Sequence, residues 1–366
     1  MASIAESWDQ QADSNAIVRF IDINLRGAGQ VMFQNNPLTG LLFLAGIFWG
    51  AYAAGMIQVG VGALVALVVA TLMAMAMDVD RQSLRIGLYG FNGILVGAAL
   101  PTFLTPTPML WVYIVIGAMV SVIAMSAIAT VFKTWNVPAL TFPFVLTTWF
   151  LVLGAYAFPG IQIASMGPPA LPEATAAASA PFLDPTFLIN GLLNGIAQVF
   201  LIQNIVTGVI FIIALAVSSW RAALFAVFGA AVALITILVL GGEPGSISAG
   251  LFGFSAVLTA IALGATFYPF SPRTVFVTLI ATIFTVIVQG ALDTALAPLG
   301  IPTFTAPFVF VTWLFLLPHL NLAPAPHEQL PVPAKGALAA PGTGDGKGPS
   351  PAVMPAGAGI RANANK

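Results

Sequence analysis

The sequence predicts an all-α membrane protein made of two inverted repeats, each with about five transmembrane helices and one re-entrant half-helix. Composition, recurring apolar stretches and internal repetition predict this fold. Of the 366 residues, 59% are hydrophobic and 6% are charged, whereas a soluble domain carries about 25% charged residues. Water cannot be the solvent for most of such a surface, so we expect a lipid bilayer around the chain.

Long apolar stretches recur along the chain and are the candidate membrane spans. The clearest are residues 38–52, 59–77, 110–132, 206–220, 222–240 and 275–288. A spanning helix needs roughly 20 apolar residues, and several of these stretches are shorter or interrupted by Gly and Pro, as in proteins whose broken helices line a cavity. Hydropathy and turn signals together predict about ten spans.

Two shorter amphipathic segments lie at roughly residues 15–34 and 185–203, and each holds too many polar residues for a lipid-facing span. The second follows Asp184 and Pro185, an N-cap residue and a proline at the first helical position. We interpret both segments as re-entrant half-helices.

Internal repetition is the strongest architectural signal. Motifs of the first half return in the second in the same order, at separations of 168, 163 and 164 residues. The matched motifs are Gln30-Val31 with Gln198-Val199, Thr39-Gly40 with Thr207-Gly208, Gly87–Phe91 with Gly250–Phe254, and Thr141–Phe144 with Thr305–Phe308, the last pair followed five residues later by Trp149 and Trp313. Chance would not keep order and spacing together, so the chain contains two homologous halves.

The basic residues predict how the halves are oriented. With a cytoplasmic N-terminus and five spans per half, the basic residues of the loops and of the tail all fall on the cytoplasmic side; they are Arg81, Arg85, Lys133, Arg221, Arg273, Lys335, Lys347, Arg361 and Lys366. The opposite loops, around residues 160–184, 241–248 and 292–300, hold no Lys or Arg, which is the positive-inside bias. An odd number of spans inverts the second half, and inverted repeats commonly hold a substrate path at their interface.

Five segments are therefore expected. They are a polar N-terminus (1–14), a first transmembrane repeat (15–160), an extracytoplasmic linker (161–184), a second transmembrane repeat (185–319) and a disordered cytoplasmic tail (320–366) rich in Pro, Ala and Gly. The N-terminal residues lack the basic start and cleavage site of a signal peptide, and the chain has no Asn-x-Ser/Thr sequon. These features favour a bacterial inner membrane.

Few residues suit catalysis or coupled transport. The chain has no cysteine, which excludes thiolate metal sites, and its net charge of −1 gives no reason to expect nucleic acid. His319 and His327 lie at the start of the tail, and no HExxH, GxSxG or nucleotide-binding glycine motif occurs. The acidic residues lie near ends and loops, so no intramembrane group suggests an ion relay. We expect no enzyme activity, no cofactor, and a neutral solute that moves without coupling.

Two pairs of polar residues recur at matching places in the halves. Gln30 and Gln198 lie in the re-entrant segments, where an amide oxygen could accept from a solute or the amide could cap a neighbouring helix; their recurrence favours the first reading. Thr141 and Thr305 each lie two residues before a proline. Their hydroxyls could bond back to their own helices, but the repeat again favours function.

The prolines after these threonines predict broken backbone at membrane depth. Proline has no N–H, so Ala139 and Thr303, four residues earlier, would keep free carbonyls if the stretch were helical. Pro138 and Pro302 interrupt the same stretches. Such backbone is tolerated only beside a cavity.

Aromatic side chains recur as well. Phe91 and Phe254 occupy matching positions, and in a pore their flat faces could lie against a planar solute whose polar groups are at its edges. Phe33 is a candidate partner for Phe91, and the second-half equivalent of Phe33 is Leu201. With 27 phenylalanines in the chain, ordinary core packing is the competing interpretation.

The motifs resemble those of the urea transporter family over about Phe20 to Pro318. They are Gly29–Phe33, Asn36–Gly40, Gly90–Gly93, Leu95–Gly97, Leu140–Phe144 and Phe304–Phe308. The resemblance implies a homotrimer with one urea pore inside each protomer, between inverted halves, lined by ladders of acceptor oxygens. Urea, the lipid bilayer and two further copies of the chain are then the partners, and conduction is passive.

The resemblance also implies roles for individual residues. Gln30 and Gln198 would be acceptors at the mouths, and Thr141 and Thr305 would supply central hydroxyls. Aromatic slots would be formed by Phe33 with Phe91 and by Leu201 with Phe254, and the apolar constriction by Val31, Leu95, Val199 and Leu258. Three residues depart from the family pattern: Leu201 makes one slot half aliphatic, Gln198 replaces an acid expected of relatives, and Ser255 stands opposite Asn92.

Other functions fit less well. An ammonium channel would need a pore histidine, and a water or glycerol channel would need paired Asn-Pro-Ala motifs, which the chain lacks. A coupled secondary transporter would need an ion site. An intramembrane enzyme would need a buried nucleophile, base or metal set, and a scaffold would not need repeated polar residues at mid-membrane depth.

Overall fold

The computed structural model describes residues 4–173 and 184–323, and within these ranges the regular secondary structure is helical, with one isolated β-bridge between Leu104 and Ile163. The helices of the first half are α1 (Ile4–Ser14), α2 (Ala16–Gln30), α3 (Pro37–Ala53), α4 (Ile57–Ala76), α5 (Arg81–Arg85), α6 (Gly90–Phe103), α7 (Pro108–Phe132), η1 (Lys133–Trp135) and α8 (Phe142–Ala157). The expected tail beyond residue 323 and part of the expected linker, residues 174–183, lie outside the described residues.

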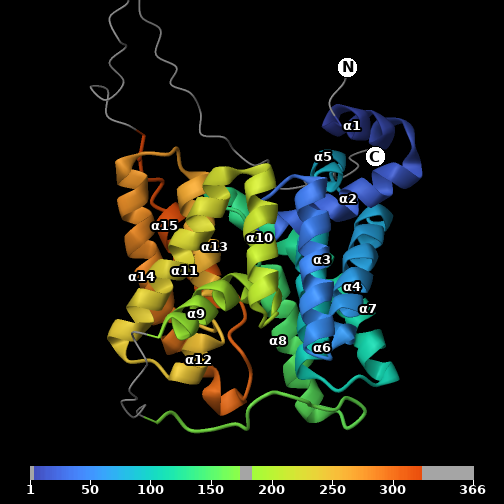
Figure 1. Ribbon diagram of the computed structural model, residues 1–366. Helices are drawn as coiled ribbons and strands as arrows, with labels where there is room; N and C mark the ends of the chain where they lie inside the picture. Colours follow the sequence, from blue (N-terminus) through green and yellow to red (C-terminus); the bar gives the residue numbers. More distant parts are fainter. Residues whose placement is uncertain (1–3, 174–183, 324–366) are drawn as a thin grey trace, which may run out of the picture.

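The second half repeats this order from α2 onward. Its helices are α9 (Pro185–Ala197), η2 (Gln198–Phe200), α10 (Ile205–Ser218), α11 (Trp220–Leu240), α12 (Pro244–Ser248), α13 (Phe254–Ile261), η3 (Ala262–Phe267), α14 (Pro272–Leu296), η4 (Ala297–Leu299) and α15 (Ala306–Leu316). Figure 1 shows the helices side by side in one bundle, with α1, α2 and α5 near its upper end and α9 and α12 toward its lower end.

Asn and Asp side chains cap the N-termini of α2 and α9 and of the helices that follow them, α3 and α10. Asn15 Oδ1 accepts from the backbone of Ile17 at the start of α2, and Asp184 Oδ1 accepts from Thr186 at the start of α9. Asn36 and Asn204 cap α3 and α10 in the same way. Each cap satisfies a backbone N–H that has no partner within its own helix. Helices therefore occupy both segments expected to be half-helices. They end short of the expected limits, α2 at Gln30 and α9 at Ala197, where η2 continues to Phe200. Their re-entrant character stays a prediction.

Several helices are long and apolar enough to cross a bilayer. They are α4, α7 with η1, α11, and α14 with η4; in addition, α9 with η2 and α10 form one apolar pair bent by 70°. The other apolar helices are shorter, such as α3 and α15. Large apolar side chains are exposed on the outside of the bundle, among them Val239, Tyr52 and Phe150. Lipid is the natural partner of such a surface. The number of ten spans stays a prediction.

Backbone geometry repeats between the halves. Residues with positive φ occur at matching positions, and they include Phe33 and Leu201, Gly87 and Gly250, Asn136 and Gly300, and Leu140 and Phe304. A left-handed backbone at a bulky residue costs about 1–3 kcal/mol and persists only where the surrounding structure imposes it. The repetition of these turns supports the sequence-based conclusion that the halves are homologous.

Helices α3 and α10 join the halves at the centre of the bundle. Thr39 Oγ1 donates to Ala214 O at 2.7 Å, and Thr207 Oγ1 donates to Gly46 O at 2.9 Å, so matched threonines make reciprocal bonds. Gly40, the neighbour of Thr39, must be a glycine because a Cβ there would lie 1.7 Å from Leu25 O of α2. This close approach packs α2 directly against α3.

Residues 4–14 of the expected polar N-terminus form α1, which packs against α2. The sequence offers little warning of this helix, since its stability depends on contacts with charged residues of α2 and α5 rather than on a continuous apolar face.

Candidate functional site

The two glutamines lie at the ends of the half-helices and make the same contact. Gln30 Nε2 donates to Ile86 O at 2.8 Å, and Gln198 Nε2 donates to Ala249 O at 3.1 Å. Both acceptors directly precede the matched glycines Gly87 and Gly250. Each amide therefore caps the end of a neighbouring short helix, α5 or α12, which is the role that competes with binding a solute. Among the described residues neither Oε1 has a partner, so both oxygens remain available as acceptors.

Left-handed turns end both half-helices. Phe33 has φ of +63° and Leu201 has φ of +59°. These are the residues assigned to the two aromatic slots, and both are bulky, so the surrounding packing must hold them in this conformation. The ring of Phe33 makes edge contacts with Phe267 and Phe308, at 5.5 Å and 6.1 Å between centroids.

The rings of Phe33 and Phe91 do not touch each other. Among the described residues, no aromatic contact joins Phe33 to Phe91. A planar solute stacked between two faces needs carbon contacts of about 3.5–4.0 Å on each side, so rings in direct contact would leave no room for it. The pairing of Phe33 with Phe91, and of Leu201 with Phe254, stays a prediction.

Thr141 and Thr305 come together at the junction of the halves. Their hydroxyl oxygens lie 2.6 Å apart, and both residues are buried. Neither hydroxyl bonds back to its own helix, because each threonine precedes the helix, α8 or α15, as its N-cap residue. The alternative interpretation, a hydroxyl that bonds back to its own helix, is therefore wrong for both threonines.

The backbone before each threonine is broken, as predicted, but the expected free carbonyls are not those of Ala139 and Thr303. Ala139 O accepts from Phe142 N at 3.3 Å, and Thr303 O accepts from Ala306 N at 3.2 Å. The prediction assumed helical backbone, whereas positive φ values at Leu140 and Phe304 fold these stretches into turns. A turn lets the nearer N–H, three residues on, reach the carbonyl that proline leaves unpaired.

Each broken stretch accepts a hydrogen bond from a tryptophan of the other half. Trp149 Nε1 of α8 donates to Pro302 O at 2.9 Å, and Trp313 Nε1 of α15 donates to Pro138 O at 2.8 Å. Both tryptophans follow the proline motif at the same distance in the sequence, but the motif alone predicts no role for them. These reciprocal bonds hold the segments that carry Thr141 and Thr305 against each other.

The four residues assigned to an apolar constriction are all buried. They are Val31, Leu95, Val199 and Leu258, each at most 1% exposed. Helix η2, which contains Val199, packs against α6 and α13, the helices of Leu95 and Leu258. Helix α2, which ends one residue before Val31, also packs against α6. A constriction formed by these four side chains stays a prediction.

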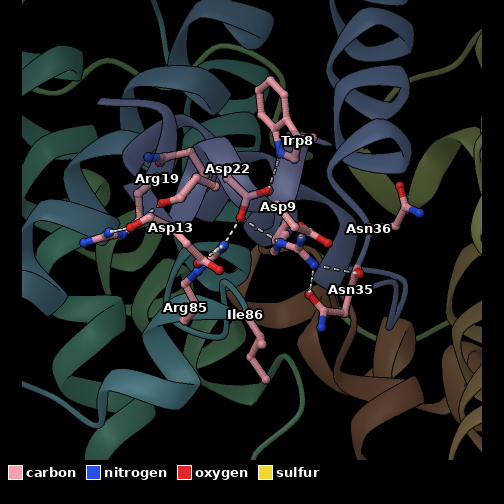
Figure 2. Close-up of polar contacts among 12 residues, drawn as sticks. Trp8, Asp9, Asp13, Arg19, Asp22, Asn35, Asn36, Arg85 and Ile86 are labelled. Atoms are coloured by element: carbon pink, nitrogen blue, oxygen red, sulfur yellow. Dashed lines mark hydrogen bonds and ion pairs between the residues drawn. The ribbon is translucent and has the colours of Figure 1, made fainter. Parts of the chain in front are cut away.

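A buried carboxylate, missed by the sequence analysis, anchors the first half-helix. Asp22 of α2 has a fully buried side chain and accepts from Trp8 Nε1 at 2.7 Å and from Arg26 Nε at 2.8 Å; Arg85 of α5 also bonds to it. Figure 2 shows Asp22 between Trp8 and Arg85. The i, i+4 spacing of Asp22 and Arg26 in a weakly charged chain is the signal that could have found this pair.

The ion pairs extend to α1. Arg26 also pairs with Asp9 at 2.7 Å, and Arg85 pairs with Asp13 at 3.3 Å. Burial alone would raise the pKa of Asp22, but hydrogen bonds from Arg26, Trp8 and Arg85 outweigh it and hold this pKa below its ordinary value. Because Arg85 precedes Ile86, whose carbonyl accepts from Gln30, the ion pairs also fix the turn that orients the glutamine.

The family model described as "Urea transporter" matches residues 21–320 of this chain. The chain belongs to the urea transporter family. Curated relatives agree with this assignment: urea transporter 1 of Capra hircus, of Ovis aries and of Rattus norvegicus are each 30% identical over 316 residues, covering 83% of this chain and 78% of theirs. The match begins at α2 and ends after α15, so it contains every candidate site residue.

Proposed function

We propose that this urea transporter family member conducts urea passively through a pore between its two halves. The observation that carries the proposal is the contact between Thr141 and Thr305, two buried hydroxyls from opposite halves. The Oε1 atoms of Gln30 and Gln198 are free to accept from a solute. These four residues supply acceptors at both mouths and at the centre.

The chemistry of urea fits such a lining. Urea is planar and neutral, with N–H donors along its edges and one carbonyl oxygen. A buried donor left without a partner costs about 1–3 kcal/mol, so the pore must replace hydration step by step. Flat apolar faces at Phe33 with Phe91, and at Leu201 with Phe254, would cover the faces of the solute. Weak sites in series then allow it to leave as well as enter.

The proposed architecture is a pair of inverted repeats, residues 15–160 and 185–319, joined by a linker of residues 161–184. Reciprocal contacts support it, since Trp149 with Pro302 mirrors Trp313 with Pro138. A two-fold relation produces such reciprocity, because each contact then occurs twice with the partners exchanged. The position of α2 near the upper end and of α9 toward the lower end in Figure 1 agrees with inversion.

We further propose a homotrimer in a bacterial inner membrane, with both termini in the cytoplasm. The trimer rests on the resemblance to the family, and the orientation rests on the basic residues of the loops. Arg81 and Arg85 lie in α5, at the same end of the bundle as α1, whereas α12 at the other end is preceded by Glu243. This distribution matches the positive-inside bias.

Stopped-flow light scattering on proteoliposomes tests the function. The same vesicles are challenged with urea, ammonium, glycerol and an impermeant osmolyte that reports water flow. Urea flux above that of protein-free vesicles, unchanged when proton and sodium gradients are collapsed, is the expected result. Uphill accumulation of urea driven by either gradient would show a coupled transporter, and flux of another solute without urea flux would show a different channel.

A further inference from the structure

The two halves differ where α6 and α13 begin. In the first half, Asn92 Oδ1 accepts from Phe144 N at 3.0 Å, and its Nδ2 donates to Met125 Sδ at 3.7 Å. The N–H of Phe144 belongs to the first turn of α8 and has no acceptor within that helix. The buried carboxamide of Asn92 therefore satisfies this turn and joins α6 to α7 and α8.

Ser255 occupies the matching position in α13, and its side chain has two fewer non-hydrogen atoms. Its Oγ is buried and has no hydrogen-bond partner among the described residues. Phe308 N is the counterpart of Phe144 N, and within the same residues no acceptor for it is present. Two polar groups are thus left unpaired at the place where the other half has an amide.

A third unpaired group comes from α14. Gln289 is the counterpart of Met125, and its Nε2 donates to Thr303 Oγ1 at 2.7 Å and to Asp293 Oδ1 at 3.0 Å. These two bonds fix the orientation of the amide. Its Oε1 is buried and, among the described residues, has no partner.

The register of α13 and α14 brings Gln289 to the height of Ser255. The hydroxyls of Thr259 and Thr285 lie 3.0 Å apart. The short connection between these helices makes them antiparallel neighbours. Ser255 is four residues before Thr259 and Gln289 is four residues after Thr285, so both lie about 6 Å, one helical turn, from the threonine pair on the same side.

We propose that one ordered water molecule binds among Ser255 Oγ, Gln289 Oε1 and Phe308 N. The water accepts from the N–H of Phe308, donates to Gln289 Oε1 and shares its remaining hydrogen bond with Ser255 Oγ. Three bonds are typical of a buried water, and a polar site of this kind holds water whereas an apolar cavity stays dry. The volume comes from the atoms that serine lacks relative to asparagine.

This water replaces the carboxamide that Asn92 supplies in the first half. It satisfies the first turn of α15, three residues after Thr305, and it contacts the amide that binds Thr303. The turn that carries Thr305 is therefore held by a bound molecule, while the turn that carries Thr141 is held by a side chain. This water site is independent of the solute that the protein conducts.

A reciprocal exchange tests the proposal on the full-length protein. A map that shows ordered water should contain density within hydrogen-bonding distance of all three groups. Ser255→Asn should displace that density with its own carboxamide and raise the midpoint of thermal unfolding. Asn92→Ser, the matched change in the first half, should lower the midpoint, because Met125 Sδ is a weaker partner for a water than an amide oxygen.

Ser255→Ala keeps the space and removes one partner, which provides a variant that does not depend on fitting a larger side chain. It should retain density against Phe308 N and Gln289 Oε1 and show a lowered midpoint. A wild-type map with no density at this position overturns the proposal. So does a Ser255→Asn protein that folds but loses as much thermal stability as Asn92→Ser.

Discussion

Thr141 and Thr305 share a hydrogen bond 2.6 Å long although 164 residues separate them. When one hydroxyl donates to the other, the second keeps its own hydrogen, and lone pairs remain on both oxygens. The pair can therefore offer a donor to a carbonyl oxygen and acceptors to N–H groups at the same point. Either hydroxyl can be the donor, so the pair adapts to a solute that arrives from either half.

Replacing one of these hydroxyls should slow urea flux. Thr141→Val or Thr305→Val removes one hydrogen bond to the solute and leaves the other hydroxyl without its partner. A net loss of about 1–1.5 kcal/mol corresponds to roughly tenfold lower flux. Stopped-flow measurements on proteoliposomes with equal protein content give the flux, and size-exclusion chromatography checks that the yield of assembled protein is unchanged.

Matched variants identify the hydroxyl as the cause. Thr141→Ser keeps a hydroxyl and should restore most of the flux. Thr236→Val is the control, because Thr236 Oγ1 only donates to Val232 O in its own helix. Wild-type flux in Thr141→Val and Thr305→Val would remove the threonines from the pathway.

We expect the free Oε1 atoms of the two glutamines to contribute to urea flux. Gln30→Leu removes the Oε1 acceptor and the bond to Ile86 O, and Gln198→Leu removes the equivalent pair at Ala249 O. We expect each variant to reduce urea flux several-fold, since one acceptor bond contributes about 1 kcal/mol. Gln82→Leu, at an exposed position of α5, is the control. Equal flux in all three variants would contradict the assigned role.

The tryptophans should stabilise the junction of the halves. Trp149→Phe removes the donor to Pro302 O while keeping an aromatic ring, and Trp313→Phe does the same at Pro138 O. Each change should lower stability by about 1 kcal/mol, seen as a lower midpoint in thermal unfolding. Trp49→Phe, at a half-exposed site on α3, should change the midpoint less. A larger loss at Trp49 than at Trp149 would argue against the contact between halves.

The carboxylate of Asp22 should stabilise the first mouth in a pH-dependent way. Asp22→Asn leaves Arg26 and Arg85 without their buried partner and should destabilise the fold by about 3 kcal/mol. Because the pKa of Asp22 is lowered in the folded state, its contribution is complete above the ordinary Asp pKa of about 3.9 and is lost as the pH falls through the lower, folded value.

Thermal unfolding from pH 7 down to acid pH checks this prediction. The difference in midpoint between wild type and Asp22→Asn should be constant at neutral pH and should shrink only in strong acid. Asp13→Asn, which removes an exposed partner of Arg85, should have little effect. If the difference in midpoint grew as the pH fell, the pKa of Asp22 would not be lowered in the folded state.

Features that repeat in the chain could be predicted from the sequence, and features that depend on unrepeated contacts could not. Helices α2 and α9 and the broken stretches before Thr141 and Thr305 follow from sequence features that occur twice. Helix α1 does not, because it is held by scattered charges of α2 and α5. The hydrogen-bond partner of the Ala139 carbonyl depends on a left-handed turn at Leu140. Leucine gives no local signal for positive φ.

The reciprocal bonds of Trp149 and Trp313 make the boundary between the halves resemble the interface of a symmetric dimer. A chain of this kind can descend from two identical half-length subunits joined end to end. Once joined, each copy is free to change alone, which two identical subunits encoded by one gene cannot do. Asn92 and Ser255 are such a divergence, and Asp22 gives the first copy a charged anchor where the second has the neutral Asn190.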